Sequence, residues 1–191
     1  MMTTAKTTIS RTSLLLGVLL LAGVVGLSTA APKEPGTASV SRPEAGLAVV
    51  IGSQPPLVVE GTDAAGRPLF RSPDGASVFL AIDVRAQKGN KNGFGAGEFV
   101  PYLSISYRAR RHDGGDEAQG QLHPLVTRAG MRYGNNLRLP GPGAYTITLT
   151  IDPPVKVGFG RHTDLETGVS RWWSTVQVEW TLKHPAPTGS R

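Results

Sequence analysis

Hydrophobic and polar residues alternate through much of the chain after residue 44, with the period of two that is typical of a β-strand buried on one face. The alternation predicts strands at 77–85, 102–109, 144–152 and 175–183. Shorter apolar or β-branched runs predict further strands at 47–51, 57–60, 121–127 and 136–139. The last of these follows Gly134-Asn135, a pair that favours a turn.

The segment 77–85 shows how the two faces of such a strand are assigned. One face carries Val78, Leu80, Ile82 and Val84, and the other carries Phe79, Ala81, Asp83 and Arg85. The first set is uniformly apolar, so it is expected to face the core, while the second set is expected to face solvent. The sequence therefore predicts a half-buried strand here.

The segments between these strands are rich in Gly, Pro, Asn and Asp, and no segment after residue 44 has the apolar stripe of a helix. This pattern predicts an all-β fold, an immunoglobulin-like antiparallel β-sandwich of seven or eight strands. The chain has no Cys, so neither a disulfide nor a thiolate metal site can support the fold. The hydrophobic core must therefore supply its stability.

The first thirty residues have the pattern of a signal peptide. Lys6 and Arg11 precede an apolar run at 14–27, and small residues follow at 28–30. The run is shorter than the roughly 20 residues that a membrane-spanning helix needs. We therefore expect cleavage of residues 1–30, a mature chain that begins near Ala31 in the periplasm or outside the cell, and no membrane span after cleavage. An uncleaved anchor is the alternative.

The rest of the chain divides by composition. Residues 31–44 are rich in Pro, Ala, Gly and Ser and predict a flexible linker. The β-sandwich domain is expected at 45–184, followed by a loose tail at 185–191. After removal of the first thirty residues, 18 of the 20 Lys and Arg and all 14 acids remain, so the net charge is 18 − 14 = +4. This mild, scattered charge does not indicate a nucleic-acid partner.

A polar loop at 159–173 carries His162 beside Asp164 and Glu166, between a glycine turn and two tryptophans. A neutral imidazole is a common ligand of transition metals, so His162 is a candidate metal ligand, although a hydrogen-bonded surface loop explains the same residues. The histidines at 112, 123, 162 and 184 lie in separate segments, with no arrangement of nucleophile, base and orienting group. The sequence therefore predicts that the chain is not an enzyme.

Several blocks taken together resemble one protein family. They are Gly89–Glu98 leading into Pro101-Tyr102-Leu103, then Tyr133–Asn136, Pro142–Tyr145, Ile151–Pro154, Gly160–Asp164, Glu166–Val169 and Trp172-Trp173. Their order and spacing resemble the bacterial periplasmic iron transport proteins that accompany an inner-membrane iron permease. The resemblance covers about residues 45 to 183. It implies a β-sandwich, often a homodimer, that binds copper and iron and acts with the permease.

The resemblance also implies a ligand set, from which this sequence departs. The family has His and Glu two apart on one strand, Met and His seven apart around a turn, and a His in the G-R-H-x-D loop. These positions fall on Phe79 and Ala81, on Leu125 and Arg132, and on His162. The first four side chains have no lone pair to offer a metal, and only His123, close to Leu125, can substitute. We therefore expect that binding of copper or iron is weak or lost.

Two functional hypotheses follow. The first is an accessory protein of iron transport with a divergent metal site, and the second is a non-metal interaction module on the same sandwich. If the fold matches the family, Arg132 is expected to lie close to His162, with Asp83 and Asp164 as candidate partners, and its guanidinium replaces the charge of the lost cation by pairing with a carboxylate. An exposed Arg on a turn is the alternative.

Overall fold

The computed structural model describes residues 37–185, so the predicted signal peptide, much of the predicted linker and nearly all of the predicted tail lie outside the described residues. The described chain forms eight strands and two short 3-10 helices. They are β1 (Ala38–Arg42), η1 (Pro43–Ala45), β2 (Leu47–Gln54), β3 (Val78–Ala86), β4 (Ser104–Arg111), β5 (Glu117–Thr127), β6 (Gly130–Leu137), β7 (Gly143–Asp152), η2 (Pro154–Val157) and β8 (Val176–His184). No helix among them is long and apolar enough to cross a membrane.

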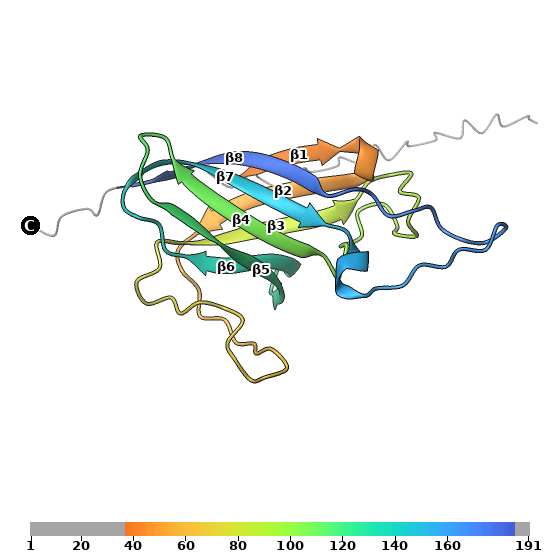
Figure 1. Ribbon diagram of the computed structural model, residues 1–191, viewed down its shortest axis with the longest axis horizontal. Coiled ribbons are helices and arrows are strands. Elements are labelled where there is room, and N and C mark those ends of the chain that lie inside the picture. The colour runs from red at the N-terminus through yellow and green to blue at the C-terminus, as the bar shows by residue number, and fades with distance from the viewer. Residues whose placement is uncertain (1–36, 186–191) are drawn as a thin grey trace, which may run out of the picture. The chain divides into compact units, whose positions relative to one another are not determined.

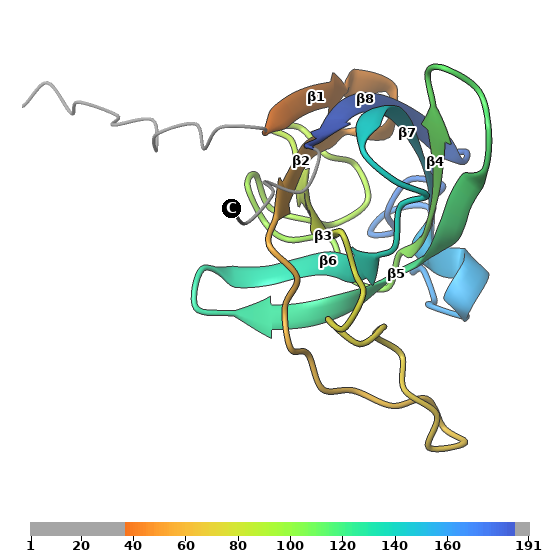
Figure 2. The same ribbon diagram turned by 90° about the vertical axis from the view of Figure 1, so that its left-hand side faces the viewer.

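All neighbouring strands are antiparallel, in the order β1-β2-β3-β6-β5-β4-β7-β8 (Figure 1). β5 is shared between two layers: its residues 117–122 pair with β4, and its residues 123–127 pair with β6. We call β1, β2, β3, β6 and residues 123–127 the first sheet, and residues 117–122, β4, β7 and β8 the second sheet. The outer strands β1 and β8 also approach each other, and Arg42 Nη2 donates to the carbonyl of Gln177 at 3.0 Å. The two layers therefore form a nearly closed sandwich (Figure 2).

The core lies between the two sheets and is built by the alternation seen in the sequence. Buried residues include Leu47, Val49, Ile51, Leu80, Ile82 and Val84 from the first sheet and Ile105, Ile147, Leu149, Ile151 and Val178 from the second. Inward-facing apolar residues from both layers interdigitate in such folds. The prediction of an all-β antiparallel sandwich is confirmed.

One polar group in this core is fully satisfied. Tyr133 is buried, and its hydroxyl accepts from the backbone N–H of Leu103 at 3.1 Å and donates to the carbonyl of Val100 at 2.9 Å. Burial raises the pKa of Tyr133 to about 12. Both bonds tie β6 to the segment before β4, which fixes the end of the first sheet against the second.

The first strand lies where the sequence predicts a flexible linker. Ala38–Arg42 pairs with β2 along its whole length, from Ala38 opposite Ile51 to Arg42 opposite Leu47. The linker prediction is therefore wrong for these residues. Main-chain groups supply this pairing, so the strand needs no run of apolar side chains.

The predicted strand at 57–60 is not formed. Leu57 instead pairs with a side chain: its N–H donates to Oδ1 of Asn136 at 3.0 Å, and its carbonyl accepts from Nδ2 of Asn136 at 2.8 Å. The buried Asn136 also donates to the carbonyl of Arg71 at 2.7 Å. One amide thus holds both ends of the long connection between β2 and β3 against β6.

Gly134 and Asn135 do not form the predicted turn, because they lie inside β6. The turn between β5 and β6 comes earlier, where Thr127 Oγ1 donates to the carbonyl of Gly130 at 3.0 Å. The prediction that Phe79 and Ala81 face solvent is also wrong, since their exposed fractions are 0% and 8%. The ring of Phe79 lies over Gly134, which leaves no room for a side chain there.

Candidate functional site

The four positions at which the resemblance places metal ligands lie together on the outer face of the first sheet. Phe79 and Ala81 are two apart on β3, so they share a face. Leu125 of β5 lies directly opposite Arg132 of β6. Ala81 lies opposite Gly134, two residues from Arg132 on the same strand. The fold therefore brings these four positions to one place, although they are far apart in the sequence.

Three small residues and one His form the floor of this face. Gly52, Ala81, Gly134 and His123 stand opposite one another across β2, β3, β6 and β5. At the β5 side, aromatic rings cover the floor: Phe79 lies over Gly134, and the ring of Phe70 meets that of His123 edge-on with centroids 5.7 Å apart. Burial lowers the pKa of His123. The half-buried imidazole therefore stays neutral more readily than a solvated one.

At the β2 side the methyl group of Thr37 lies over Gly52, and a cavity of about 120 Å³ adjoins this part of the floor. Its charged wall is made by Asp83 and Arg132, and its small floor by Gly52 and Ala81. Asp83 Oδ2 accepts from Nε of Arg85 at 3.0 Å. The other carboxylate oxygen, Oδ1, and Nε of Arg132 are both buried and have no hydrogen-bond partner among the described residues.

Arg132 does not form the ion pair expected from the sequence. It shares the cavity with Asp83, but no carboxylate of residues 37–185 lies within 4.0 Å of its guanidinium. Asp164 pairs instead with His162, from Nε2 to Oδ2 at 3.4 Å. Arg132 is therefore a half-buried cation that forms no ion pair within 4.0 Å among residues 37–185.

His162 lies in an exposed loop with contacts of its own. Its Nε2 is 3.0 Å from Oγ1 of Thr167 and close to Asp164. The loop is held to the connection after β3, where the N–H of Ser170 donates to the carbonyl of Lys91 at 2.9 Å. None of these contacts joins His162 to His123 or to the four positions. Across residues 37–185, no three His, Asp or Glu side chains gather closely enough to hold a metal ion.

An aromatic stack anchors the base of the His162 loop. Tyr102 stacks on Phe159 with ring centroids 4.6 Å apart, and Phe159 lies 6.2 Å from Trp172. Trp172 meets Trp173 edge-on at 5.7 Å, and Trp173 belongs to the hydrophobic core. Offset and edge-on ring contacts of this kind stabilise a surface segment. The base of the loop is therefore fixed, while His162 itself faces solvent.

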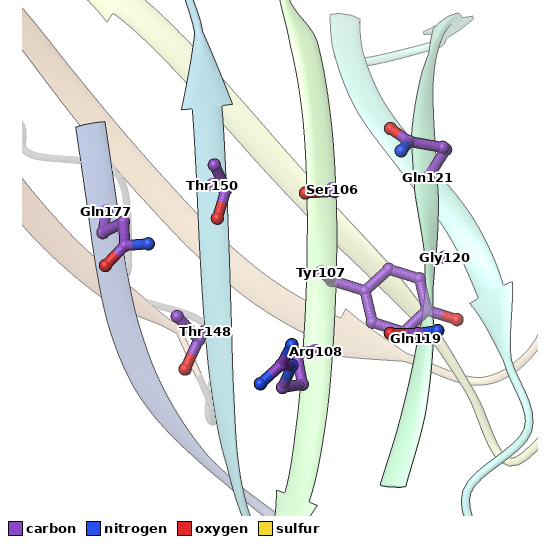
Figure 3. A pocket seen from close by; sticks show the side chains of 9 residues that line it. All are labelled: Ser106, Tyr107, Arg108, Gln119, Gly120, Gln121, Thr148, Thr150 and Gln177. Carbon is purple, nitrogen blue, oxygen red and sulfur yellow. The ribbon is translucent and has the colours of Figure 1, made fainter. Parts of the chain in front are cut away.

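A second, larger concavity of about 720 Å³ lies on the outer face of the second sheet (Figure 3). Gln121, Ser106, Thr150 and Gln177 form a row across its four strands. Its lining holds no His, Asp or Glu, so it offers no usual metal ligand apart from neutral oxygens. Sequence reasoning did not single out this surface, although the alternation in 102–109 and 144–152 places these hydroxyl groups outward.

The fold and its outer-face site place the chain among two-layer antiparallel β-sandwich proteins. More narrowly, the sequence profile of the family described as Fe2+ transport protein matches residues 58–185, and the chain belongs to this family. A UPF0423 protein of Brucella abortus is 36% identical over 149 residues, which span 71% of this chain and 81% of that protein. The resemblance recognised in the sequence blocks is therefore confirmed.

Solved structures agree with this assignment. FetP of uropathogenic Escherichia coli is 37% identical, with a TM-score of 0.69 over 78% of this chain and 93% of FetP. A copper-bound variant of P19 from Campylobacter jejuni is 31% identical, with a TM-score of 0.70 over 80% of this chain and all of that chain. The sandwich described above is thus the fold of these proteins.

Proposed function

We propose that this protein is an exported accessory protein of iron uptake in which the metal site has lost most of its ligands. The observation that carries the proposal is the composition of the outer face of the first sheet. Phe79, Ala81, Leu125 and Arg132 are brought together there, and none of them can donate a lone pair to a metal. Membership of the Fe2+ transport protein family supports the role in iron uptake.

The charge on this face also opposes metal binding. A guanidinium stays protonated at all ordinary pH values, so Arg132 repels a divalent cation placed over Ala81. The two remaining imidazoles, His123 and His162, have no contact with each other. A site with one or two ligands cannot provide the four-ligand closure that gives tight binding.

A calorimetric titration of metal-free protein with copper tests the proposal. We expect no stoichiometric, high-affinity site for Cu²⁺. A one-to-one complex with a submicromolar Kd that disappears in His162→Ala, but not in the exposed His112→Ala, would overturn it and assign His162 to a metal centre. The same titration with Fe²⁺ under anaerobic conditions should give the same result.

The proposed partners are an inner-membrane iron permease and a second copy of the chain, and the proposed location is the periplasm. The family and the signal-like residues 1–30 support these assignments. The intact mass of exported protein should correspond to a start near Ala31, and a mass that retains residues 14–27 would indicate an anchor instead. An iron permease gene beside the coding sequence would favour this function.

The second candidate is a non-metal interaction module on the same scaffold. It is favoured by the replacement of donor side chains by Phe79 and Leu125, which leaves the sandwich intact without its metal chemistry. Deletion of the gene separates the two candidates. A growth defect confined to iron-limited medium and restored by the intact gene supports iron uptake, whereas a defect independent of iron supports the interaction module.

A further inference from the structure

We propose that an exposed apolar patch around η2 is a docking surface for an anionic lipid bilayer. The patch, which we call the η2 patch, consists of Tyr102, Val155, Lys156, Val157 and Phe159. Tyr102 and both valines are each more than half exposed, and Phe159 is more than one-third exposed. Large apolar side chains that gather at one place on a surface mark a site of contact with another molecule or a membrane.

The local fold brings these side chains together. η2 follows the end of β7 and turns back at once: the N–H of Phe159 donates to the carbonyl of Pro154 at 3.2 Å, and Val155 and Val157 lie on the turn between them. The ring of Phe159 then stacks on that of Tyr102 with centroids 4.6 Å apart. In Figure 2 this blue turn projects from the margin of the fold, so the valines are not covered by a neighbouring strand.

The backbone of Tyr102 is strained in a way that supports a functional role for its ring. Its φ is 60°, and among residues 37–185 it is the one non-glycine residue with a positive φ. Bulky residues in such conformations are found mainly at functional sites, where the surrounding structure enforces them. Because most of Tyr102 is exposed, the strain does not serve packing of the core. It holds an aromatic ring at the surface, beside Phe159.

The position of Lys156 favours a lipid surface over a protein partner. Lys156 stands between the two exposed valines and forms no ion pair among the described residues. Lysine is depleted at the centre of protein–protein interfaces. At a bilayer, the aliphatic stem of the same side chain contacts the apolar layer while its ammonium group reaches the lipid phosphates. A symmetric contact between two copies of the chain, centred here, would instead bring two Lys156 side chains together.

The charge around η2 fits an anionic surface. Residues 153–163 contain two basic side chains, Lys156 and Arg161, and no acid. The acids that flank this segment, Asp152 and Asp164, each contact a neighbouring polar side chain. Aromatic and aliphatic side chains beside basic ones are typical of segments that lie in the interface of a membrane, where apolar area and attraction to anionic lipids add to the affinity.

This inference deepens the proposed function and rests on it for the location, because an exported protein that acts with an inner-membrane permease works beside a lipid surface. It adds a way for the protein to stay there, through shallow and reversible contact of the η2 patch. The vesicles used in the test contain neither metal nor permease. Failure of the test therefore leaves the proposed role in iron uptake standing, and failure of that role leaves the test unaffected.

The test is flotation of the exported, metal-free protein with two kinds of vesicle, one of phosphatidylcholine and one of phosphatidylcholine and phosphatidylglycerol in equal parts. We expect binding to the mixed vesicles that is at least about fivefold stronger than binding to phosphatidylcholine, since each basic residue near an anionic surface adds about that factor. Added salt should reduce the difference. Lys156→Gln should weaken binding to the mixed vesicles by about fivefold.

Val157→Asp should weaken binding to the mixed vesicles by at least about tenfold, because it removes an apolar group and adds a charge that the lipids repel. Val58→Asp makes the same change at an exposed valine of the β2–β3 connection and should bind like the wild type. Both variants should keep the urea midpoint of the wild type, since both positions are exposed. Absence of binding to the mixed vesicles, or equal binding by Val157→Asp, would overturn the proposal. A change of oligomeric state in Val157→Asp, measured by light scattering, would also overturn it and assign the η2 patch to a second copy.

Discussion

The ring of Phe79 lies so close to Gly134 that a β-carbon at residue 134 would come within 2.5 Å of ring atom Cζ. The two residues sit on neighbouring strands, and the main-chain carbonyl of Leu80 closes the same space at 2.8 Å. An aromatic side chain at position 79 and a glycine at position 134 therefore depend on each other. This pair occupies the part of the outer face where the resemblance places the first metal ligand.

We expect Gly134→Ala to lower the free energy of unfolding by roughly 1–3 kcal/mol or more, because overpacking a tight site forces side chains and backbone to move. Urea denaturation measures the change. Gly160→Ala is the matched control: no atom lies within 4 Å of a β-carbon there, so the change should stay within about 0.5 kcal/mol. Equal stability of the two variants would contradict the packing described.

Asn136→Leu should release the long connection between β2 and β3. The substitution removes the amide that bonds both main-chain groups of Leu57 and the carbonyl of Arg71. Each lost hydrogen bond leaves a main-chain polar group without a partner. We expect the free energy of unfolding to fall by about 2–3 kcal/mol, and by no more than this, because the segment can detach and expose these groups to water. Limited proteolysis should cut faster between residues 55 and 77. The exposed Gln119→Leu should show no such change, and an uncut Asn136→Leu protein would argue against this tether.

Tyr133 should make the protein sensitive to alkaline pH. Its pKa is raised to about 12 by burial, against about 10 in an unfolded chain. Its contribution to stability is therefore complete below pH 10 and is lost as the pH rises from 10 to 12, because the unfolded state releases the proton first. A difference of about two in pKa between the folded and unfolded states corresponds to about 2–3 kcal/mol in the free energy of unfolding.

Urea unfolding at pH 9 and pH 11.5 tests this prediction. Tyr133→Phe should cost about 1–3 kcal/mol at pH 9, because Leu103 N–H and the carbonyl of Val100 lose their partner, and should then lose less stability than the wild type at pH 11.5. Tyr102→Phe, at an exposed ring, should follow the wild type at both pH values. Parallel pH curves for all three proteins would refute the role of Tyr133.

Arg132→Ala should cost no more than about 1 kcal/mol. A buried ion pair would cost roughly 3 kcal/mol or more when broken, but the guanidinium has no carboxylate within 4.0 Å among the described residues, so mainly the packing of its aliphatic stem is lost. Urea denaturation beside the exposed Arg128→Ala provides the comparison. A loss above about 3 kcal/mol in Arg132→Ala alone would point to an ion pair after all.

Metal binding should return only when the whole ligand set is rebuilt. Phe79→His, Ala81→Glu, Leu125→Met and Arg132→His together should create a stoichiometric copper site, while each single change should not, because the coordination shell stays open. Calorimetric titration with Cu²⁺ measures this. A folded quadruple variant without copper binding would show that the four positions are not the ligand positions.

The strands that the sequence predicts correctly are those whose apolar and polar side chains alternate, such as 144–152, because the alternation itself shows which face is buried. Its errors arise where the partner is distant in the sequence. The pairing of Leu57 with Asn136 spans 79 residues. Gly134 predicts a turn from its local sequence, but the structure shows that it is a glycine within a strand because the ring of Phe79 lies over it. The cavity could not be predicted for the same reason: Asp83 and Arg132 line it together only after β3 and β6 have paired.

β1 pairs through five residues with the edge of β2 that lies away from β3. Without β1, the main-chain N–H and C=O groups along Val49, Val50 and Ile51 would form an unprotected strand edge, and such edges recruit strands from other molecules. These β-branched residues are well suited to intermolecular sheet formation. Proteolytic trimming beyond Arg42 would therefore leave the core largely intact yet convert a well-behaved protein into one prone to strand exchange and aggregation.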